Sequence, residues 1–259
     1  MSVLKIATLQ TDIIWESPAE NRSKLEQMIL GINEPVDVIV LPETFSTGFS
    51  MNTSLAETID GETMQWLSGL SQLKQSVICG SIMLKDKHED AYNRLIWMKP
   101  EGSYYAYNKK HLFSIGQENN HYKPGNQKVI IELNGFKILL SVCYDLRFPV
   151  WLRRTPKADY DAILMVANWP ERRAEHWNAL LKARAIENQC YVVAVNRVGQ
   201  DGNSVNHSGD TQIIHPNGKV IYHCTQRAEI AINSIRLNEV QQYRNDFPVW
   251  NDADRFELL

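Results

Sequence analysis

Three side chains able to carry out nucleophilic chemistry stand where apolar runs of the sequence end. Glu43 follows "VIVLP", Lys109 follows "YAYN", and Cys143 follows "ILLSV". A carboxylate, an ammonium group and a thiol can act as a general base, an electrostatic stabiliser and a nucleophile. In α/β folds, ligands bind outside the carboxyl ends of the strands. If the apolar runs are strands, these residues form one candidate site.

Each residue also has an ordinary interpretation. A free cysteine is usually a small buried hydrophobe, and Glu43 after Leu-Pro is typical of a turn. One of the adjacent lysines Lys109 and Lys110 is more often a solvated surface charge. His111 and His176 also allow a Cys–His pair, and the residue pattern alone does not separate that pair from structural histidines. Spacing along the chain does not show which of these side chains meet.

Short apolar runs and helical patterns alternate along the chain and must position these residues. The run "DVIVL" (37–41) has the continuous apolar character of a strand buried on both faces. Ser17, Pro18 and Glu20 form a capping-box pattern that predicts a helix start, with Glu20 reaching back to the cap. Asn134-Gly135 predicts a tight hairpin between strands 129–133 and 136–142.

Two further helices are predicted, over 62–75 and 171–188. The residues expected to face the core are Trp66, Leu67, Leu70 and Leu73 in the first helix, and Trp177, Leu180 and Leu181 in the second. The other predicted strands are 4–9, 77–84, 92–98, 161–167, 191–195, 211–214 and 219–223. No linker or repeat divides the chain, so residues 1–259 are expected to form a single domain. Hairpins mixed with strand–helix units favour an α/β domain, with one mixed sheet or two sheets packed together and helices outside.

The bulk composition disfavours several classes of function. The 259 residues are 44% hydrophobic and 22% charged, which is typical of a soluble globular protein with a sizeable core. A net charge of −3 without a dense basic cluster leaves no electrostatic footprint for nucleic acid. No apolar run is long enough to predict a membrane span, and the opening "MSVLKIATLQTD" does not read as a signal peptide.

The four cysteines are scattered without the C-x-x-C spacing of metal sites. They are Cys79, Cys143, Cys190 and Cys224. In a chain of this length without an export signal, they are expected to be reduced thiols. The cytoplasm is therefore the expected location.

Longer segments around the candidate residues resemble successive signatures of the nitrilase superfamily, the carbon–nitrogen hydrolases with a Glu-Lys-Cys triad. These segments are "LPETFSTGF", "NKKHLF", "GQENNHYKPG" and "VCYDLRFP", followed by "ANWP", "EHWNALLKARAIENQCYVVAVNRVG" and "GDTQIIHPNGKV". The joint pattern is highly specific and covers nearly the whole chain. The resemblance implies a single-domain α-β-β-α sandwich of two mixed sheets flanked by helices. It also implies a homodimer or a higher homo-oligomer.

The resemblance assigns roles to the matching positions. The triad matches Glu43, Lys109 and Cys143, and a supporting second glutamate matches Glu118. In the implied mechanism, Glu43 takes the thiol proton and Cys143 attacks an amide carbon, while Lys109 and the backbone N–H of Tyr144 stabilise the oxyanion. Ammonia leaves, and Glu43 activates the water that hydrolyses the thioester. No step requires a metal or an organic cofactor, and the resemblance disfavours a Cys–His pair.

The resemblance is strongest to the bacterial omega-amidase branch, whose members hydrolyse small 2-oxo dicarboxylate monoamides such as 2-oxoglutaramate. The segment "HLFSIGQENNHYKPGN" departs from the acidic "HLFD" and longer insertion of the animal omega-amidases. Alternative substrates are deaminated glutathione and an N-carbamoyl compound, and a non-catalytic interaction subunit is the alternative outside the enzymes. An arginine near the site can pair with a substrate carboxylate through a forked hydrogen bond. The residues expected to bind the substrate are Arg147, Asn168, Trp169, Arg173 and His176.

Overall fold

The strands lie in two sheets of a computed structural model that describes residues 2–254. The first sheet contains, in spatial order, β13 (Glu229–Arg236), β1 (Val3–Gln10), β2 (Val38–Val40), β3 (Val77–Lys85), β4 (Ala91–Met98) and β5 (Tyr104–Asn108). The second contains β10 (Val198–Gln200), β11 (Asn206–Ile214), β9 (Tyr191–Asn196), β8 (Ala162–Ala167), β7 (Phe136–Val142) and β6 (Ile130–Leu133), with β12 (Val220–Thr225) paired to β11. The helices are α1 (Pro18–Leu30), α2 (Glu62–Lys74), α3 (Glu118–His121), α4 (Pro149–Leu152), α5 (Ala174–Asn188) and α6 (Leu237–Asp246).

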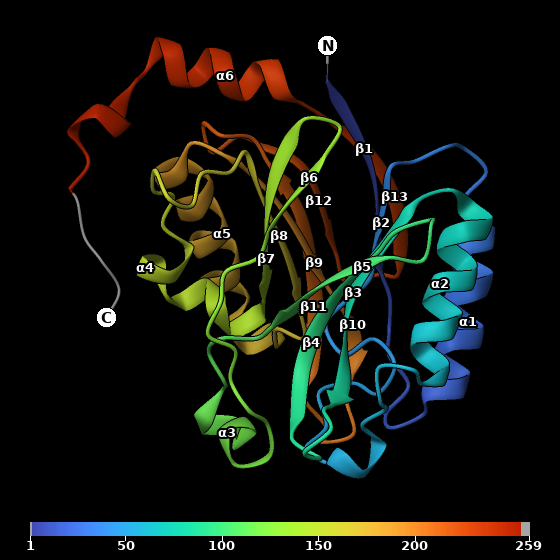
Figure 1. Ribbon diagram of the computed structural model, residues 1–259. Coiled ribbons are helices and arrows are strands. Elements are labelled where there is room, and N and C mark those ends of the chain that lie inside the picture. The colour runs from blue at the N-terminus through green and yellow to red at the C-terminus, as the bar shows by residue number, and fades with distance from the viewer. Residues whose placement is uncertain (1, 255–259) are drawn as a thin grey trace.

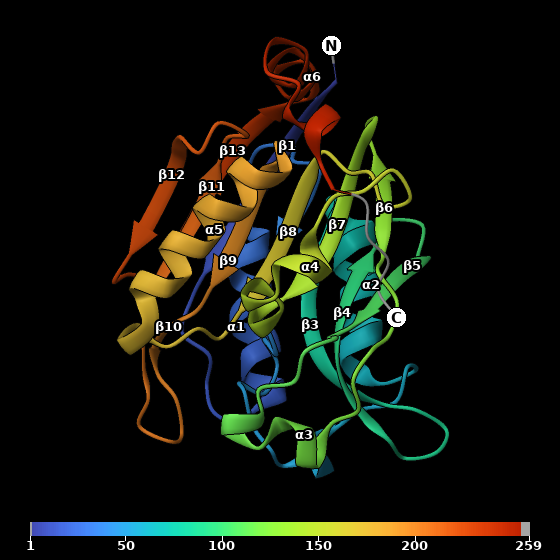
Figure 2. The same cartoon turned by 90° about the vertical axis from the view of Figure 1, so that its left-hand side faces the viewer.

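The two sheets pack face to face, and helices cover their outer faces. Figure 1 shows α1 and α2 on the outside of the first sheet, with α4 and α5 on the outside of the second. Figure 2, turned by 90°, shows α5 lying along the second sheet. The fold is therefore the α-β-β-α sandwich expected from the sequence.

Alternation of side chains along the strands builds two parts of the core. In β1, Leu4 and Ile6 belong to a cluster shared with strands of the second sheet. Ala7 and Leu9 belong to a different cluster, which includes residues of α1 and α2. Successive side chains on a strand point to opposite faces, so the first sheet contributes to the central layer and to the layer under its helices.

The strand directions bring several carboxyl ends together. β1, β2 and β3 are parallel, and β4 runs antiparallel to both β3 and β5. β5 therefore points the same way as β2 and β3. In the second sheet, β7, β8 and β9 are parallel. The segments that leave β2, β5, β7 and β8 carry the candidate site residues.

Most predicted helices and strands are present, with boundaries shifted by a few residues. The predicted helix 171–188 begins as a 3-10 turn, Glu171–Arg173, and becomes α-helical only at Ala174. A strand ending before Lys109 was expected, without bounds, and is present as β5. β10, β13, α3, α4 and α6 were not predicted. β10, α3 and α4 carry too few residues for a periodic pattern, β13 is only half buried along its length, and Val240 is the one fully buried residue of α6.

Two details of the sequence prediction are wrong. The Ser17 hydroxyl donates to Glu20 Oε1 at 2.7 Å, and it makes no cap to the backbone of α1. Leu73, expected in the core, is 66% exposed. The buried face of α2 passes through Leu67 and Ser71, so position 73 falls on the solvent side of the helix.

Within the part of the chain described, none of the helices has the length and apolar character needed to cross a bilayer. The structure contains one chain, and the expected homodimer stays a prediction.

Candidate active site

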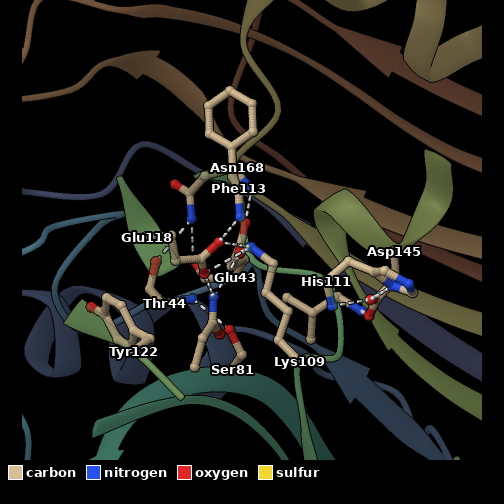
Figure 3. Close-up of polar contacts among 12 residues, drawn as sticks. Glu43, Thr44, Ser81, Lys109, His111, Phe113, Glu118, Tyr122, Asp145 and Asn168 are labelled. Carbon is tan, nitrogen blue, oxygen red and sulfur yellow. Dashed lines mark hydrogen bonds and ion pairs between the residues drawn. The ribbon is translucent and has the colours of Figure 1, made fainter. Parts of the chain in front are cut away.

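Lys109 lies between two carboxylates at the carboxyl ends of the strands (Figure 3). Its Nζ is 2.9 Å from Glu43 Oε1 and 2.9 Å from both carboxylate oxygens of Glu118. All three side chains are buried. Burial by itself lowers the pKa of Lys109, but the charges of Glu118 and Glu43 outweigh it and raise that pKa above its ordinary value. Lys109 is therefore a fixed positive charge.

Asn93, on β4, is a fourth member of this cluster and was not predicted. Its Nδ2 donates to Glu43 Oε1 at 2.7 Å and to Glu118 Oε1 at 3.3 Å. A neutral amide can hold two carboxylates side by side without adding to their repulsion. The only signal in the sequence is one polar amide inside an apolar strand.

Glu118 begins α3 and is fixed from a second direction. The backbone N–H of Phe113 donates to Glu118 Oε2 at 2.6 Å. Burial raises the pKa of Glu118, the charge of Lys109 opposes this, and the charge of Glu43 adds to it. The pKa of Glu118 is above its ordinary value because burial, together with the Glu43 charge, outweighs the charge of Lys109.

Glu43 is held from both sheets. On the side of the first sheet, the backbone N–H of the next residue, Thr44, donates to Ser81 Oγ of β3 at 2.8 Å. From the second sheet, the backbone N–H of Asn168 donates to Glu43 Oε2 at 2.7 Å, and its side-chain amide donates to the Glu43 carbonyl oxygen at 2.6 Å. Asn168 was expected to bind the substrate, which stays a prediction; the structure shows that it orients Glu43.

Cys143 is the first residue of a 3-10 helix, Cys143–Arg147, that starts where β7 ends. Its φ of +45° lies in the left-handed region, which costs a non-glycine residue about 1–3 kcal/mol. Burial raises the pKa of the thiol, as do the charge of Glu43 and a hydrogen bond to it, while the charge of Lys109 opposes the shift. The resting group is a neutral thiol beside a carboxylate that can take its proton.

Tyr144 follows the cysteine in this 3-10 helix. The first N–H groups of a helix have no acceptor within the helix, so the Tyr144 N–H can donate to a bound group. The Tyr144 ring packs edge-on against Phe113, with centroids 5.1 Å apart, and against Phe148 at 5.2 Å. These contacts hold the residue that carries the candidate oxyanion donor.

Three arginines line the cavity next to the thiol. The cavity has a volume of about 190 Å³, and Arg147, Arg172 and Arg173 all border it. Arg147 lies over the Trp169 ring at 4.8 Å, and Arg173 lies over the Phe113 ring at 5.2 Å. Burial lowers the pKa of Arg173, and the charges of Arg172 and Arg147 lower it further. An anion bound among these arginines would relieve their mutual repulsion.

The two histidines weighed as partners for the thiol bond elsewhere. His111 Nδ1 lies 2.8 Å from Asp145 Oδ1. His176 is exposed, and its Nδ1 lies 3.1 Å from Arg147 Nη2. His176 is not among the residues that border the cavity, so its contact with the site runs through Arg147.

Another wall of the cavity comes from the loop between β10 and β11 together with the start of β11, and it was not predicted. Asp201, Asn203, Val205 and His207 border the cavity there. Burial lowers the pKa of His207 to about 4, and the charge of Arg197 contributes to the shift. The sequence shows this segment only as a polar loop. The other unpredicted lining residues include Phe49, Met51 and Phe113.

Comparisons with known proteins identify similar chains. A profile of the carbon-nitrogen hydrolase family matches residues 5–245. The chain is 41% identical to omega-amidase YafV of Escherichia coli (strain K12), over 100% of both chains. It is 34% identical to a 2-oxoglutaramate amidase of Bacillus subtilis (strain 168), over 95% of this chain and 96% of that one.

A solved structure is similar over its full length. It is a CN-hydrolase superfamily protein of Xanthomonas campestris, which carries an arsenic adduct in its active site. The two chains are 37% identical and superpose with a TM-score of 0.97, over 100% of each.

Asn93→Asp is expected to lower kcat/KM for amide hydrolysis by about 100-fold or more. A third carboxylate beside Glu43 and Glu118 would exceed what one ammonium group can balance, and the cluster would take up a proton. The rate of ammonia release measures the effect. Asn108→Asp is the matched control on β5: it lies beside Arg94, whose Nε donates to Asn108 Oδ1 at 2.6 Å, and is expected to retain activity. Equal losses in both variants would contradict the role given to Asn93.

His207→Asn is expected to make stability less sensitive to acid. Because the folded-state pKa of about 4 lies below the ordinary histidine value of 6.5, the unfolded chain binds a proton between these values that the folded chain does not. Stability is therefore lost as the pH falls through this window. Urea unfolding should show that, between roughly pH 7 and 4.5, the free energy of unfolding falls by about 2 kcal/mol more in the wild type than in the variant. His121→Asn, at an exposed position, should follow the wild type; parallel curves for wild type and His207→Asn would reject the assignment.

Proposed function

Since the chain belongs to the carbon–nitrogen hydrolase family, we propose that it hydrolyses the terminal amide of a small 2-oxo dicarboxylate monoamide. The products are the acid and ammonia, and the substrate is of the 2-oxoglutaramate or 2-oxosuccinamate type. The observation that carries the proposal is a thiol beside a buried carboxylate–ammonium pair, in a cavity bordered by three arginines. The names of the two relatives identical at 41% and 34% support the same substrate class.

The nucleophile forms by proton transfer within the site. Amides are poor electrophiles, and covalent catalysis divides one hard step into two easier ones. The pKa of Cys143 is raised, so the thiol stays protonated until a substrate is bound. Glu43 then takes the proton as general base, and the thiolate attacks the amide carbon. The left-handed turn at Cys143 presents the thiol to the cavity that Glu43 and Lys109 also border.

The oxyanion that follows needs fixed donors. The Lys109 ammonium group and the Tyr144 N–H supply them, and loss of one such donor typically costs about two to three powers of ten in turnover. Glu43 returns its proton to the departing nitrogen, and ammonia leaves a thioester on Cys143. Glu43 then accepts a proton from water, which attacks the thioester and breaks its C–S bond; the acid leaves, and the proton passes from Glu43 to the Cys143 sulfur to restore the thiol. Glu118 holds Lys109 in place throughout.

The far end of the substrate carries a carboxylate. Arg147 and Arg173 have aromatic rings beneath their guanidinium groups, which leaves their edges available for forked hydrogen bonds to that carboxylate. The cavity of about 190 Å³ is smaller than the roughly 300–1,000 Å³ typical of sites for drug-sized ligands. This size favours a small monoamide over deaminated glutathione.

The buried charges of this site argue against the alternative of a non-catalytic subunit. A buried ion pair beside a thiol with a raised pKa is costly to maintain, and such perturbed groups cluster where chemistry occurs. The four cysteines are free thiols, which supports placing the enzyme in a reducing compartment such as the cytoplasm.

The purified protein is expected to release ammonia from 2-oxoglutaramate, and Cys143→Ala is expected to release none. Enzyme quenched during turnover should carry an acyl group on Cys143, measured as added peptide mass. An acyl group on Cys79, Cys190 or Cys224 would refute the assignment of the nucleophile. If neither the wild type nor Cys143→Ala hydrolyses any of a panel of amides and carbamoyl compounds, the proposed function is refuted.

The two adjacent lysines give a matched control for the same assay. Lys109→Ala should abolish activity, because it removes an oxyanion donor and leaves two carboxylates unpaired. Lys110→Ala should retain most activity, since the Lys110 ammonium group lies over the Trp151 ring at 5.5 Å. Activity retained in Lys109→Ala and lost in Lys110→Ala would show that Lys110 is the catalytic lysine.

Arg173→Gln is expected to lower kcat/KM for 2-oxoglutaramate by about 10- to 100-fold relative to a neutral amide such as butanamide. Hydrogen bonds to charged groups contribute about 1.5–3 kcal/mol, and the neutral amide lacks the carboxylate that makes them. Arg147→Gln tests the second arginine in the same way. Arg153→Gln is the control, because Arg153 lies over the Trp250 ring and does not border the cavity. Unchanged selectivity in both cavity variants would rule out carboxylate binding by these arginines.

A further inference from the structure

Asp145 is a buried carboxylate that the proposed reaction does not use. Its Oδ2 accepts the Tyr107 hydroxyl at 2.7 Å and the Val142 backbone N–H at 3.1 Å. Its Oδ1 accepts the backbone N–H of His111 at 3.0 Å and lies 2.8 Å from His111 Nδ1 (Figure 3). The side chain has no exposed surface.

Burying a carboxylate in this way lowers the stability of the fold unless its contacts compensate. A buried charge costs free energy unless it is paired and hydrogen-bonded. Among residues 2–254, the ion-pair partner found for Asp145 is His111 alone, and the other contacts are neutral donors. A neutral side chain could fill the same volume at lower cost. The positions of the groups that donate hydrogen bonds to Asp145 indicate the role of this carboxylate.

The four contacts of Asp145 join the segment around Cys143 to the segment around Lys109, which is distant along the chain. Val142 immediately precedes Cys143, so its bond to Oδ2 closes the turn that holds the thiol. Tyr107 and His111 stand two residues before and two residues after Lys109. One carboxylate therefore fixes the start of the nucleophile turn and both flanks of the lysine segment.

The donors that reach Asp145 are themselves held. Trp151 Nε1 donates to the Tyr107 hydroxyl at 3.0 Å. Burial and the charge of Asp145 raise the pKa of Tyr107, which keeps that hydroxyl protonated as a donor. The His111 ring stacks on Phe148 with centroids 3.8 Å apart. The carboxylate is thus the centre of a rigid frame.

We propose that Asp145 is a positioning residue, which sets the place of the Cys143 thiol relative to the Lys109 ammonium group by bonding to the segments of both. The proposal rests on the proposed amidase function, in which the thiol and the ammonium group act on the same carbonyl. A displacement of about 1 Å between reacting groups can cost about 100-fold in rate. Asp145 itself touches neither substrate nor reacting atoms.

Asp145→Asn is the main test. The amide oxygen can keep the bonds to Val142 and Tyr107, but the amide nitrogen would face the backbone N–H of His111, so the tie to the flank after Lys109 is lost. We expect kcat for 2-oxoglutaramate to fall about 100-fold while KM stays within about threefold, because Arg172 and Arg173 border the cavity from a segment that Asp145 does not bond. Tyr107→Phe removes a single bond and should cost about tenfold or less in kcat.

Asp161→Asn is the matched control. Asp161 is also a buried carboxylate, only 8% exposed, and accepts the Lys137 backbone N–H at 3.0 Å and Arg244 Nη1 at 2.9 Å. It lies at the start of β8, at the opposite end from the candidate site. Asp161→Asn should lower Tm as Asp145→Asn does, yet keep kcat per folded molecule. If both variants lose kcat only in proportion to their folded fraction, Asp145 is merely structural and the proposal is wrong.

Crystal structures of the two variants provide a readout that needs no substrate. In Asp145→Asn, Cys143 should move by about 1 Å or more relative to Lys109, and in Asp161→Asn it should not. Absence of any amidase activity in the wild type would end the proposed function, whereas the crystal structures would still decide the positioning role. An unmoved Cys143 in Asp145→Asn would overturn the inference.

Discussion

The burial of one ammonium group between two carboxylates is the constraint on which the site depends. Lys109 contacts Glu43 and Glu118 at 2.9 Å with almost no access to water. Removing one partner of a buried pair typically costs about 3–5 kcal/mol, because the remaining charge is left unpaired. The cluster therefore requires every member, including the neutral Asn93 amide that bonds to both carboxylates. It also requires a fold that delivers these groups from separate segments to one point without exposing them.

The sandwich meets that requirement through the directions of its strands. Glu43 follows β2 and Lys109 follows β5, and these two strands of the first sheet run the same way. Cys143 follows β7, which is parallel to β8 in the second sheet. The segment after β8 crosses between the sheets, since Asn168 bonds to the side chain and the backbone of Glu43. A strand can shift its neighbours only by breaking a ladder of hydrogen bonds. Sheet pairing therefore fixes the positions of the candidate catalytic groups, and the connecting segments border the cavity, as the segment bearing Asp201 and His207 does.

The sequence was informative where a pattern extends over many residues and uninformative where a single contact matters. Apolar runs such as 37–41 predicted the strands, because burial on both faces leaves no polar positions. The two-sheet architecture and the grouping of Glu43, Lys109, Glu118 and Cys143 came from the family resemblance. Alternation and spacing left both open. Asn93 and His207 could not be found in this way, because their roles depend on partners distant along the chain. Leu73 failed for a different reason: it is apolar, but the buried face of α2 passes through Leu67 and Ser71, so position 73 points to solvent.

The charge of the cluster explains why the thiol remains neutral until substrate binds. One ammonium group and two carboxylates leave an excess of negative charge, and burial together with the Glu43 charge raises the pKa of Cys143. In the proposed reaction, the proton that leaves Cys143 arrives on Glu43. The negative charge therefore moves from Glu43 to the sulfur and then to the oxyanion, and the total buried charge does not change. Lys109 contacts Glu43 at the start of this movement and the oxyanion at its end. Because the displaced charge stays within reach of one fixed ammonium group, no large rearrangement of solvent or side chains is needed between the steps.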